Sequence, residues 1–64
     1  RLATIGEGDG WSIELYLMAY PDTYKPFYVL GLWDKRENRI KKSISFAPDD
    51  MRRLRDVLNE YIRG

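Results

Sequence analysis

Residues 11–20, WSIELYLMAY, alternate between apolar and polar side chains along the whole segment. A period of two matches an extended strand, in which successive side chains point to opposite faces, and it does not match the 3.6-residue period of a helix. The segment therefore predicts a strand with one apolar face. The apolar side holds Trp11, Ile13, Leu15 and Leu17, and the other side holds Ser12, Glu14, Tyr16, Met18 and Tyr20.

Three more segments are predicted to be strands. Residues 1–6 contain the short run Leu-Ala-Thr-Ile, residues 27–34 contain FYVLGLW, which is apolar throughout, and residues 39–46 alternate again. For residues 39–46 we expect one apolar side and one basic, hydroxylated side. The apolar side holds Ile40, Ile44 and Phe46, and the basic side holds Arg39, Lys41, Ser43 and Ser45.

The connections between these segments are rich in turn-forming residues. Residues 6–10 read GEGDG, and Asp9-Gly10 suits a turn with positive φ. The segment lacks the lysine and the Ser/Thr of a phosphate-binding P-loop, so we interpret it as a turn. Pro21 and Pro26 bracket the loop PDTYKP, because proline cannot donate a ladder hydrogen bond.

The last segment, residues 48–63, is predicted to be an amphipathic helix. Pro48 suits the first helical position, and Asp49 and Asp50 follow in the first turn, where negative charge complements the helix dipole. Apolar residues recur at three- and four-residue spacing, which places them on one side of the helix. They are Met51, Leu54, Val57, Leu58, Tyr61 and Ile62, and Gly64 follows as a helix end.

Together these elements predict one α+β domain over residues 1–64, with a four-stranded antiparallel curved sheet followed by one C-terminal helix. The strands are expected at about 1–6, 11–20, 27–34 and 39–46, and the helix at about 48–63. A single helix covers only one face of such a sheet. The other face is left for water, a partner subunit or a ligand.

A chain of 64 residues hides only about 60% of the surface that its unfolded form exposes, so its core is thin. The sequence has no cysteine for a disulfide and no histidine or cysteine cluster for a structural metal. Oligomerisation is then the expected supplement, and we predict a homodimer. The helix stripe is interpreted as core plus dimer contact, with Leu54, Leu58 and Tyr61 at the interface and no need for a cofactor.

Several classes of function are disfavoured by what the sequence lacks. Without histidine or cysteine the chain has neither the commonest general base nor the best nucleophile, and the carboxylates Glu7, Asp9 and Glu14 have no spacing that forces a pair together. We predict that it is not an enzyme. No apolar stretch reaches the roughly 18 residues that cross a bilayer, so we expect no membrane partner and an intracellular location.

Charge is distributed unevenly along the chain. Residues 1–34 hold two basic and five acidic residues, a net −3, whereas residues 35–64 hold nine basic and five acidic residues, a net +4. Such a separation can make a basic face that attracts polyanions. Five of the basic residues lie in the predicted hairpin LWDKRENRIKKSISF, and these are Lys35, Arg36, Arg39, Lys41 and Lys42.

These basic residues, with nearby rings, form a candidate site for single-stranded nucleic acid. Cations bind phosphates, and aromatic faces stack on bases for about 1–3 kcal/mol each. Two other interpretations stay open: the charges can simply blunt an edge strand, and the tyrosines can be ordinary cross-strand packing. Trp33 can equally belong to the core or to a dimer interface. The candidate residues are Tyr16, Tyr20, Lys25, Trp33, Lys35, Arg36, Arg39, Lys41 and Lys42.

The order of elements and the segment KKSISFAPDDMRRLRDVL resemble two families that bind single-stranded nucleic acid. In the positive cofactor four transcriptional coactivators, a basic residue, a short strand of the I-S-L type and a proline-initiated helix close the domain. The Pur-alpha family has repeats of four strands and a helix, often with a helix that is similar to Leu54–Leu58. The resemblance covers about residues 27–62, and the hairpin before the last strand is shorter here.

The resemblance implies a homodimer that holds single-stranded DNA or RNA across its curved sheets, in transcription, replication or repair. Lys41 and Lys42 match the basic residues before the final strand, and Trp33 lies near an aromatic position at the end of the third strand. The alternative is a protein-interaction or assembly module, in which FYVLGLW and the helix stripe join another chain and the lysines only keep the protein in solution.

Overall fold

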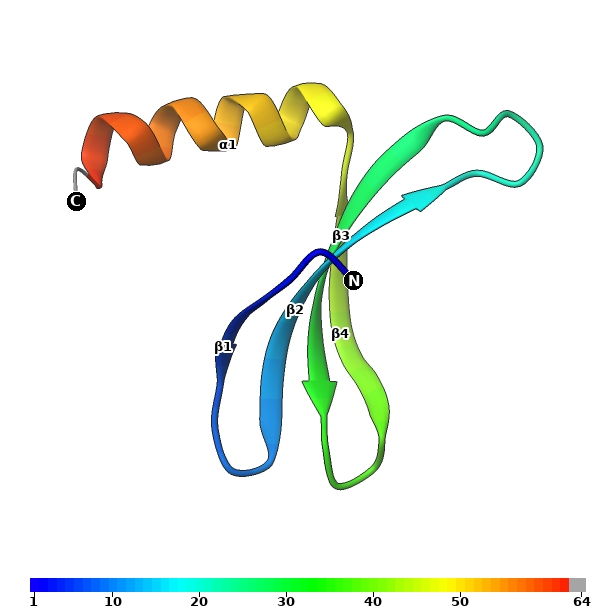
Figure 1. The fold of residues 1–64 in the computed structure, drawn as a ribbon, viewed down its shortest axis with the longest axis vertical. Coiled ribbons are helices and arrows are strands. Elements are labelled where there is room, and N and C mark those ends of the chain that lie inside the picture. Colours follow the sequence, from blue (N-terminus) through cyan, green and yellow to red (C-terminus); the bar gives the residue numbers. More distant parts are fainter. Residues whose placement is uncertain (63–64) are drawn as a thin grey trace.

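The computed structural model describes residues 1–62 and contains four strands followed by one helix (Figure 1). The predicted α+β class, with a curved, open antiparallel sheet and a C-terminal helix, is confirmed. The predicted helix end at residue 63 and its termination at Gly64 lie outside the described residues. The elements are β1 (Ala3–Glu7), β2 (Trp11–Ala19), β3 (Pro26–Asp34), β4 (Arg39–Phe46) and α1 (Pro48–Tyr61).

The sheet is a meander in which each strand pairs with the next, in the order β1-β2-β3-β4. The central pair, β2 and β3, is in register from Trp11 opposite Asp34 to Ala19 opposite Pro26. β1 pairs with only the first half of β2, up to Leu15. The register shifts once between Thr4 and Gly6 and once between Leu32 and Trp33, which marks a bulge in β1 and another in β4.

Cross-strand pairing divides the side chains into two faces. We call the face that α1 approaches the helix-side face, and the opposite one the open face. In β2 the odd residues lie on the helix-side face and the even residues on the open face, as predicted. The helix-side face includes Ile13, Leu15, Leu17, Tyr28, Leu30, Leu32, Lys42, Ile44 and Phe46, and the open face includes Thr4, Ser12, Glu14, Tyr16, Met18, Phe27, Val29, Trp33, Ile40, Ser43 and Ser45.

The alternation predicted for β4 is wrong at its first half. Lys41 is the extra residue of the β4 bulge, because Leu32 pairs with Lys42 while the next residue of β3, Trp33, pairs with Ile40. An extra residue reverses the alternation on one side of a bulge. Ile40 therefore lies on the open face beside Trp33, instead of on the helix-side face with Ile44. Arg39, opposite Asp34, lies on the helix-side face instead of with Ser43 and Ser45.

The turns also differ from expectation in one respect. No glycine has positive φ within residues 1–62, so the prediction for Asp9-Gly10 is wrong. Positive φ occurs at Tyr24 and at Asn38, each inside a hairpin connection. Glycine is required at position 8 for a different reason, because a Cβ there would lie 2.6 Å from Nε1 of Trp11.

The helix begins as the sequence predicts. Pro48 is its first residue, and the carboxylate of Asp50 accepts a hydrogen bond of 3.1 Å from the backbone N–H of Ala47. This bond satisfies a donor that the first turn leaves without an intrahelical partner. From there α1 runs away from the sheet, and only its beginning lies near β3 and β4 (Figure 1).

Little of the molecule is buried. Val29, with 8% of its surface exposed, is the one buried apolar side chain in the described part of the chain, and no residue of α1 within it is buried. Between α1 and the helix-side face lies an apolar cavity of about 240 Å³, lined by residues such as Leu15, Phe46 and Leu58. The helix-side face is therefore only loosely covered. Within residues 1–62, no helix combines the length and the apolar character needed to cross a membrane.

Candidate nucleic-acid interface

The open face carries four aromatic rings on β2, β3 and the residue after β2. Tyr16, Phe27 and Trp33 are partly exposed, and Tyr20 is half exposed. Tyr20 and Phe27 stack on each other with ring centroids 4.5 Å apart and planes at 29°. The rings lie on one face because Tyr16 and Tyr20 are even residues of the alternating segment, while Phe27 and Trp33 pair with Met18 and Ser12.

The centre of the open face is low because Gly31 has no side chain. A Cβ at Gly31 would lie 3.6 Å from Cγ2 of Ile40 and 3.7 Å from Cε2 of Tyr16. The ring of Tyr16 and the branched chain of Ile40 thus flank this position from the two neighbouring strands. Together these two side chains cover the backbone of β3 at this point, and Gly31 itself is buried.

Glu14 is a buried carboxylate on the open face, 6% exposed. The hydroxyl of Thr4 donates to its two oxygens at 2.7 and 3.1 Å, and the guanidinium of Arg1 donates to Oε1 at 3.0 Å. Ser12 adds a longer bond of 3.4 Å. The Thr4 hydroxyl, followed by Arg1, holds the pKa of Glu14 below its ordinary value of 4.5. The charge is thus stabilised within the sheet and ties β1 to β2.

One end of the sheet, where the β2–β3 loop meets the start of α1, has a cleft of about 320 Å³. It combines the stacked rings of Tyr20 and Phe27 with the cation of Lys25 and the hydroxyl of Ser45. A volume of this size is at the low end of small-molecule sites. Pro26, Phe46, Ala47 and Pro48 complete its lining.

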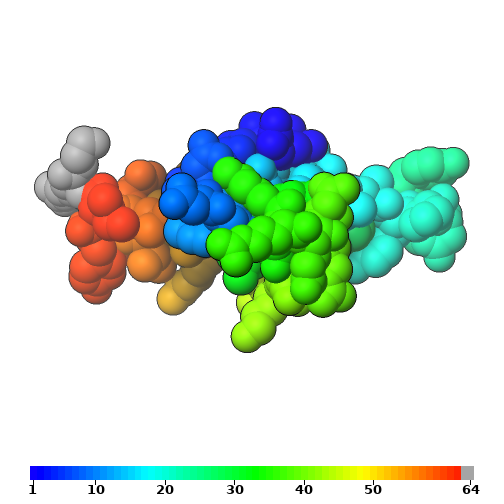
Figure 2. Space-filling view, turned by 90° about the horizontal axis from the view of Figure 1, so that it is seen from below, coloured from blue at the N-terminus to red at the C-terminus, as the bar shows by residue number. Residues whose placement is uncertain are grey.

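The opposite end of the sheet consists of two hairpin tips that lie side by side (Figure 2). The ammonium group of Lys35 joins them, 2.9 Å from a carboxylate oxygen of Glu7 and 3.3 Å from the carbonyl of Gly8. The backbone N–H of Lys35 donates to the carbonyl of Gly10 at 2.9 Å. Arg36 lies close to Gly10, since a Cβ built there would be 3.3 Å from the guanidinium Nε. Lys35 therefore holds the tips together, and Arg36 lies along them.

Four charged residues of the β3–β4 hairpin form a group that we call the tip cluster: Asp34, Glu37, Arg39 and Lys41. Glu37 is 2.6 Å from Nε of Arg39 and 3.1 Å from Nζ of Lys41, and Asp34 is 3.7 Å from Lys41. Arg39 and then Lys41 lower the pKa of Glu37, and Glu37 in turn raises the pKa of Lys41. The backbone N–H groups of Glu37 and Arg36 lower the pKa of Asp34. The cluster is charged and self-paired.

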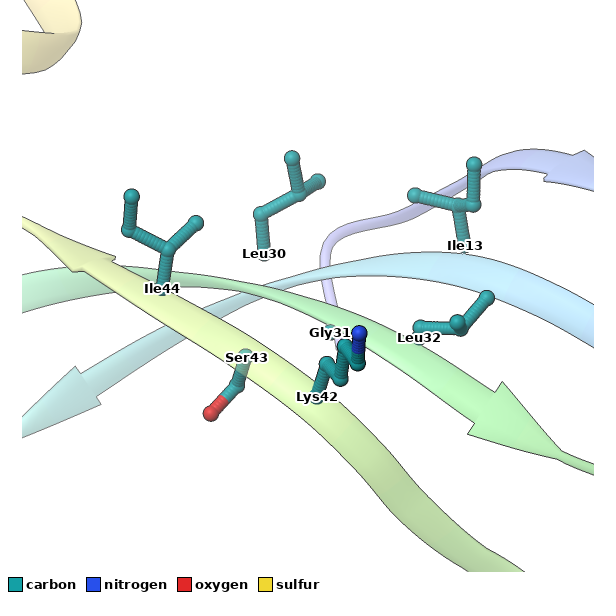
Figure 3. A pocket seen from close by; sticks show the side chains of 7 residues that line it. All are labelled: Ile13, Leu30, Gly31, Leu32, Lys42, Ser43 and Ile44. Atoms are coloured by element: carbon teal, nitrogen blue, oxygen red, sulfur yellow. The ribbon is translucent and has the colours of Figure 1, made fainter.

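Lys42 lies on the other face. It lines an apolar groove of about 330 Å³ on the helix-side face, and its side chain points to the same side as Leu30 and Ile44, while Ser43 points away (Figure 3). Lys42 is therefore separated by the sheet from Tyr16 and Trp33. The groove is otherwise lined by Ile13, Gly31 and Leu32.

The predicted site residues thus form three groups. The open face brings together Tyr16 and Trp33, the loop end brings together Tyr20 and Lys25, and the hairpin tips bring together Lys35, Arg36, Arg39 and Lys41. Lys42 joins none of these groups. The structure adds Phe27 and Ile40 to the open face. Sequence reasoning gave Phe27 no face because FYVLGLW is apolar throughout, and it put Ile40 on the wrong face because it did not foresee the bulge.

The residues predicted for dimer contact lie on the side of α1 that carries the apolar stripe. Leu54 and Leu58 are 38% and 42% exposed, and Tyr61 is more exposed still. Val57, at 40%, belongs with them. Within residues 1–62, no three His, Cys, Asp or Glu side chains are placed to hold a metal ion.

The sheet is thus incompletely covered. Aromatic rings lie on its open face, the apolar stripe of α1 packs loosely against its helix-side face, and cations lie at both of its ends. Comparison of the chain with models of protein families, with characterised proteins and with solved structures gave no match.

Proposed function

We propose that this protein is a homodimer that binds single-stranded DNA or RNA with little sequence preference, in transcription, replication or repair. One observation carries the proposal: four aromatic rings lie on the face of the sheet that α1 leaves open. Rings with an accessible face stack on any base, which gives affinity without base-edge readout. The resemblance of the final strand and helix to single-strand binders points the same way.

Cations at both ends of the open face support a path for the phosphate backbone. Lys25 stands at the loop end beside the Tyr20–Phe27 pair, and Arg36 stands at the hairpin tips beyond Trp33. A strand laid from one end to the other meets Lys25, the Tyr20–Phe27 pair, Tyr16 and Trp33 and, at the hairpin tips, Arg36. Exposed serines of β4, Ser43 and Ser45, offer hydroxyls to sugars or phosphates along the way.

The homodimer is supported by the amount of surface left exposed. The accessible surface is 5412 Å², whereas a compact folded chain of this mass exposes about 4,300 Å². The excess of roughly 1,100 Å² is larger than the about 800 Å² per partner that a standard interface buries. The half-exposed Leu54, Val57 and Leu58, together with the apolar cavity beneath α1, mark the surface that a second copy would cover.

The proposal is tested by fluorescence anisotropy with a labelled oligonucleotide. The first expected result is a preference for the single strand over the duplex. The second is that the logarithm of the binding constant falls linearly with the logarithm of the salt concentration, with a slope of about −0.7 for each phosphate neutralised. Replacement of Trp33 by Ala should weaken binding by about 1–3 kcal/mol and leave the salt slope unchanged. Lys25→Ala should reduce the slope instead.

The matched control for Trp33 is Tyr28→Ala, because Tyr28 lies on the helix-side face at the end of β3 that is far from the hairpin tips, and its loss should leave oligonucleotide affinity nearly unchanged. In the Trp11→Phe protein, added oligonucleotide should quench the remaining fluorescence of Trp33. Equal affinity for the duplex, or no binding at low salt, would refute the proposal.

A second candidate function is an assembly module that binds no nucleic acid. It is favoured by the apolar groove of the helix-side face and by the half-exposed apolar stripe of α1. This function predicts a stable oligomer with no response to oligonucleotide in either assay. The two candidates therefore differ in the anisotropy result and agree on the oligomeric state.

A further inference from the structure

Glu37 occupies a position that a phosphate group would fit. Its carboxylate oxygen Oε2 contacts Nε of Arg39 at 2.6 Å and Nζ of Lys41 at 3.1 Å. These are the lengths of charge-assisted hydrogen bonds, and a phosphate oxygen forms bonds of the same kind with guanidinium and ammonium groups. The two cations thus form an anion site that is filled by the chain's own side chain.

The backbone of the hairpin holds this site in place. Asp34 accepts hydrogen bonds from the backbone N–H groups of Arg36 at 2.8 Å and Glu37 at 3.1 Å, which fixes the turn. Asn38 takes a positive φ of 56°, so the chain reverses directly before Arg39. Lys41 is the extra residue of the β4 bulge, and bulges commonly re-aim a side chain out of the regular ladder. The site is therefore built by the fold.

The bonds that Glu37 makes are replaceable. All three side chains are about half exposed, and ion pairs in that setting are weak because water screens them. A nucleic-acid backbone presents many phosphates held in a row by neighbouring contacts, so it can displace one carboxylate where a single free phosphate competes poorly. Glu37 would then lower the affinity of the Arg39–Lys41 site for a single small anion more than its affinity for a long nucleic-acid strand.

From this geometry we infer that Glu37 is an internal competitor that fills a phosphodiester site made by Arg39 and Lys41, and that a bound single strand displaces it. This inference rests on the proposed function, and it carries the bound strand around the hairpin tips, because Arg39, opposite Asp34, lies on the same face as Trp11. It identifies which cations receive phosphates and what limits their contribution. It assigns to Glu37 a role in setting affinity that its turn position alone would not require.

The test is Glu37→Gln, which keeps the shape of the side chain and removes its charge. Single-strand affinity at low salt should rise about three- to tenfold, from the loss of two exposed ion pairs. The salt slope should become steeper by up to about 1.4, because two more cations are free to meet phosphates. Glu60→Gln, which changes the net charge equally on the last turn of α1, should change affinity less than twofold.

Alanine variants of Arg39 and Lys41, combined with Glu37→Gln, complete two double-mutant cycles. Arg39→Ala and Lys41→Ala should each reduce affinity more in the Glu37→Gln background than in the wild type, since only there are the cations released. If the wild type binds the oligonucleotide but Glu37→Gln binds no tighter than Glu60→Gln, the inference is wrong while the proposed function stands. If neither wild type nor variant binds any oligonucleotide, both are wrong.

Discussion

At the scale of single residues, Glu14 is the most unusual side chain of the sheet. A carboxylate that is almost fully covered is rare unless it is paired, and here Thr4 and Arg1 supply the partners. Both partners belong to the first few residues of the chain. The charge of Glu14 therefore links the N-terminal segment to β2, and its protonation state should affect the stability of the sheet.

Acid should weaken this link in a defined pH range. Because the folded-state pKa of Glu14 is lower than its ordinary value of 4.5, its contribution to stability is present above about pH 4.5 and is lost as the pH falls through the folded-state pKa. Glu14→Gln should lower the melting temperature at pH 7, and the difference from the wild type should shrink below pH 4.5. A difference that stays constant from pH 7 to pH 3 would contradict this role.

At the scale of elements, the sheet covers the apolar stripe of α1 only in part. The helix is well started by Pro48 and the Asp50–Ala47 bond, yet Leu54, Val57 and Leu58 remain about 40% exposed. Helices in proteins gain most of their stability from packing of such a stripe. The second copy of the proposed homodimer would cover the exposed part of this stripe.

A charge on this stripe should break the dimer. Leu58→Asp removes apolar burial from both copies and places two carboxylates in the interface, which should cost about 2–4 kcal/mol per dimer. The dissociation constant would rise at least about thirtyfold, measured by sedimentation equilibrium. Asn59→Asp introduces the same charge next to it on the other side of the helix, and it should leave dimerisation unaffected.

Most element boundaries and both faces of β2 could be predicted from the sequence, because WSIELYLMAY is regular and each residue follows the period of two. The face of Ile40 could not, since a bulge is set by how two strands pair and leaves no pattern in either strand alone. Phe27 was missed because FYVLGLW has no polar side. The pairing of Glu37 with Arg39 and Lys41 depends on how the turn folds back, which composition does not specify.

At the scale of the whole molecule, the chain measures 39 × 34 × 16 Å and is a thin, spread shape with one buried apolar side chain in its described part. A free-standing domain of this size depends on a core that this chain lacks. For the proposed homodimer we therefore expect folding and association to be one process, as in obligate dimers, whose stability depends on protomer concentration.

This coupling predicts a melting temperature that depends on protein concentration. By mass action, each tenfold increase should raise the melting temperature by about 5 °C for a dimer of this length. Calorimetry or circular dichroism over two decades of concentration measures it directly. A melting temperature that does not change over that range would show that the monomer folds alone.

The bulge in β4 also determines which residue of that strand can change without a shift of its pairing. Without Lys41, Ile40 would still meet Trp33 and Lys42 would still meet Leu32, now as adjacent rungs of an unbroken ladder. That deletion would keep the other ladder pairs of β4 and would remove the ion pairs of Lys41 with Glu37 and Asp34. Position 41 is therefore a place in β4 where a residue can be lost without a change of register, so the strand pairing leaves the side chain there free to vary.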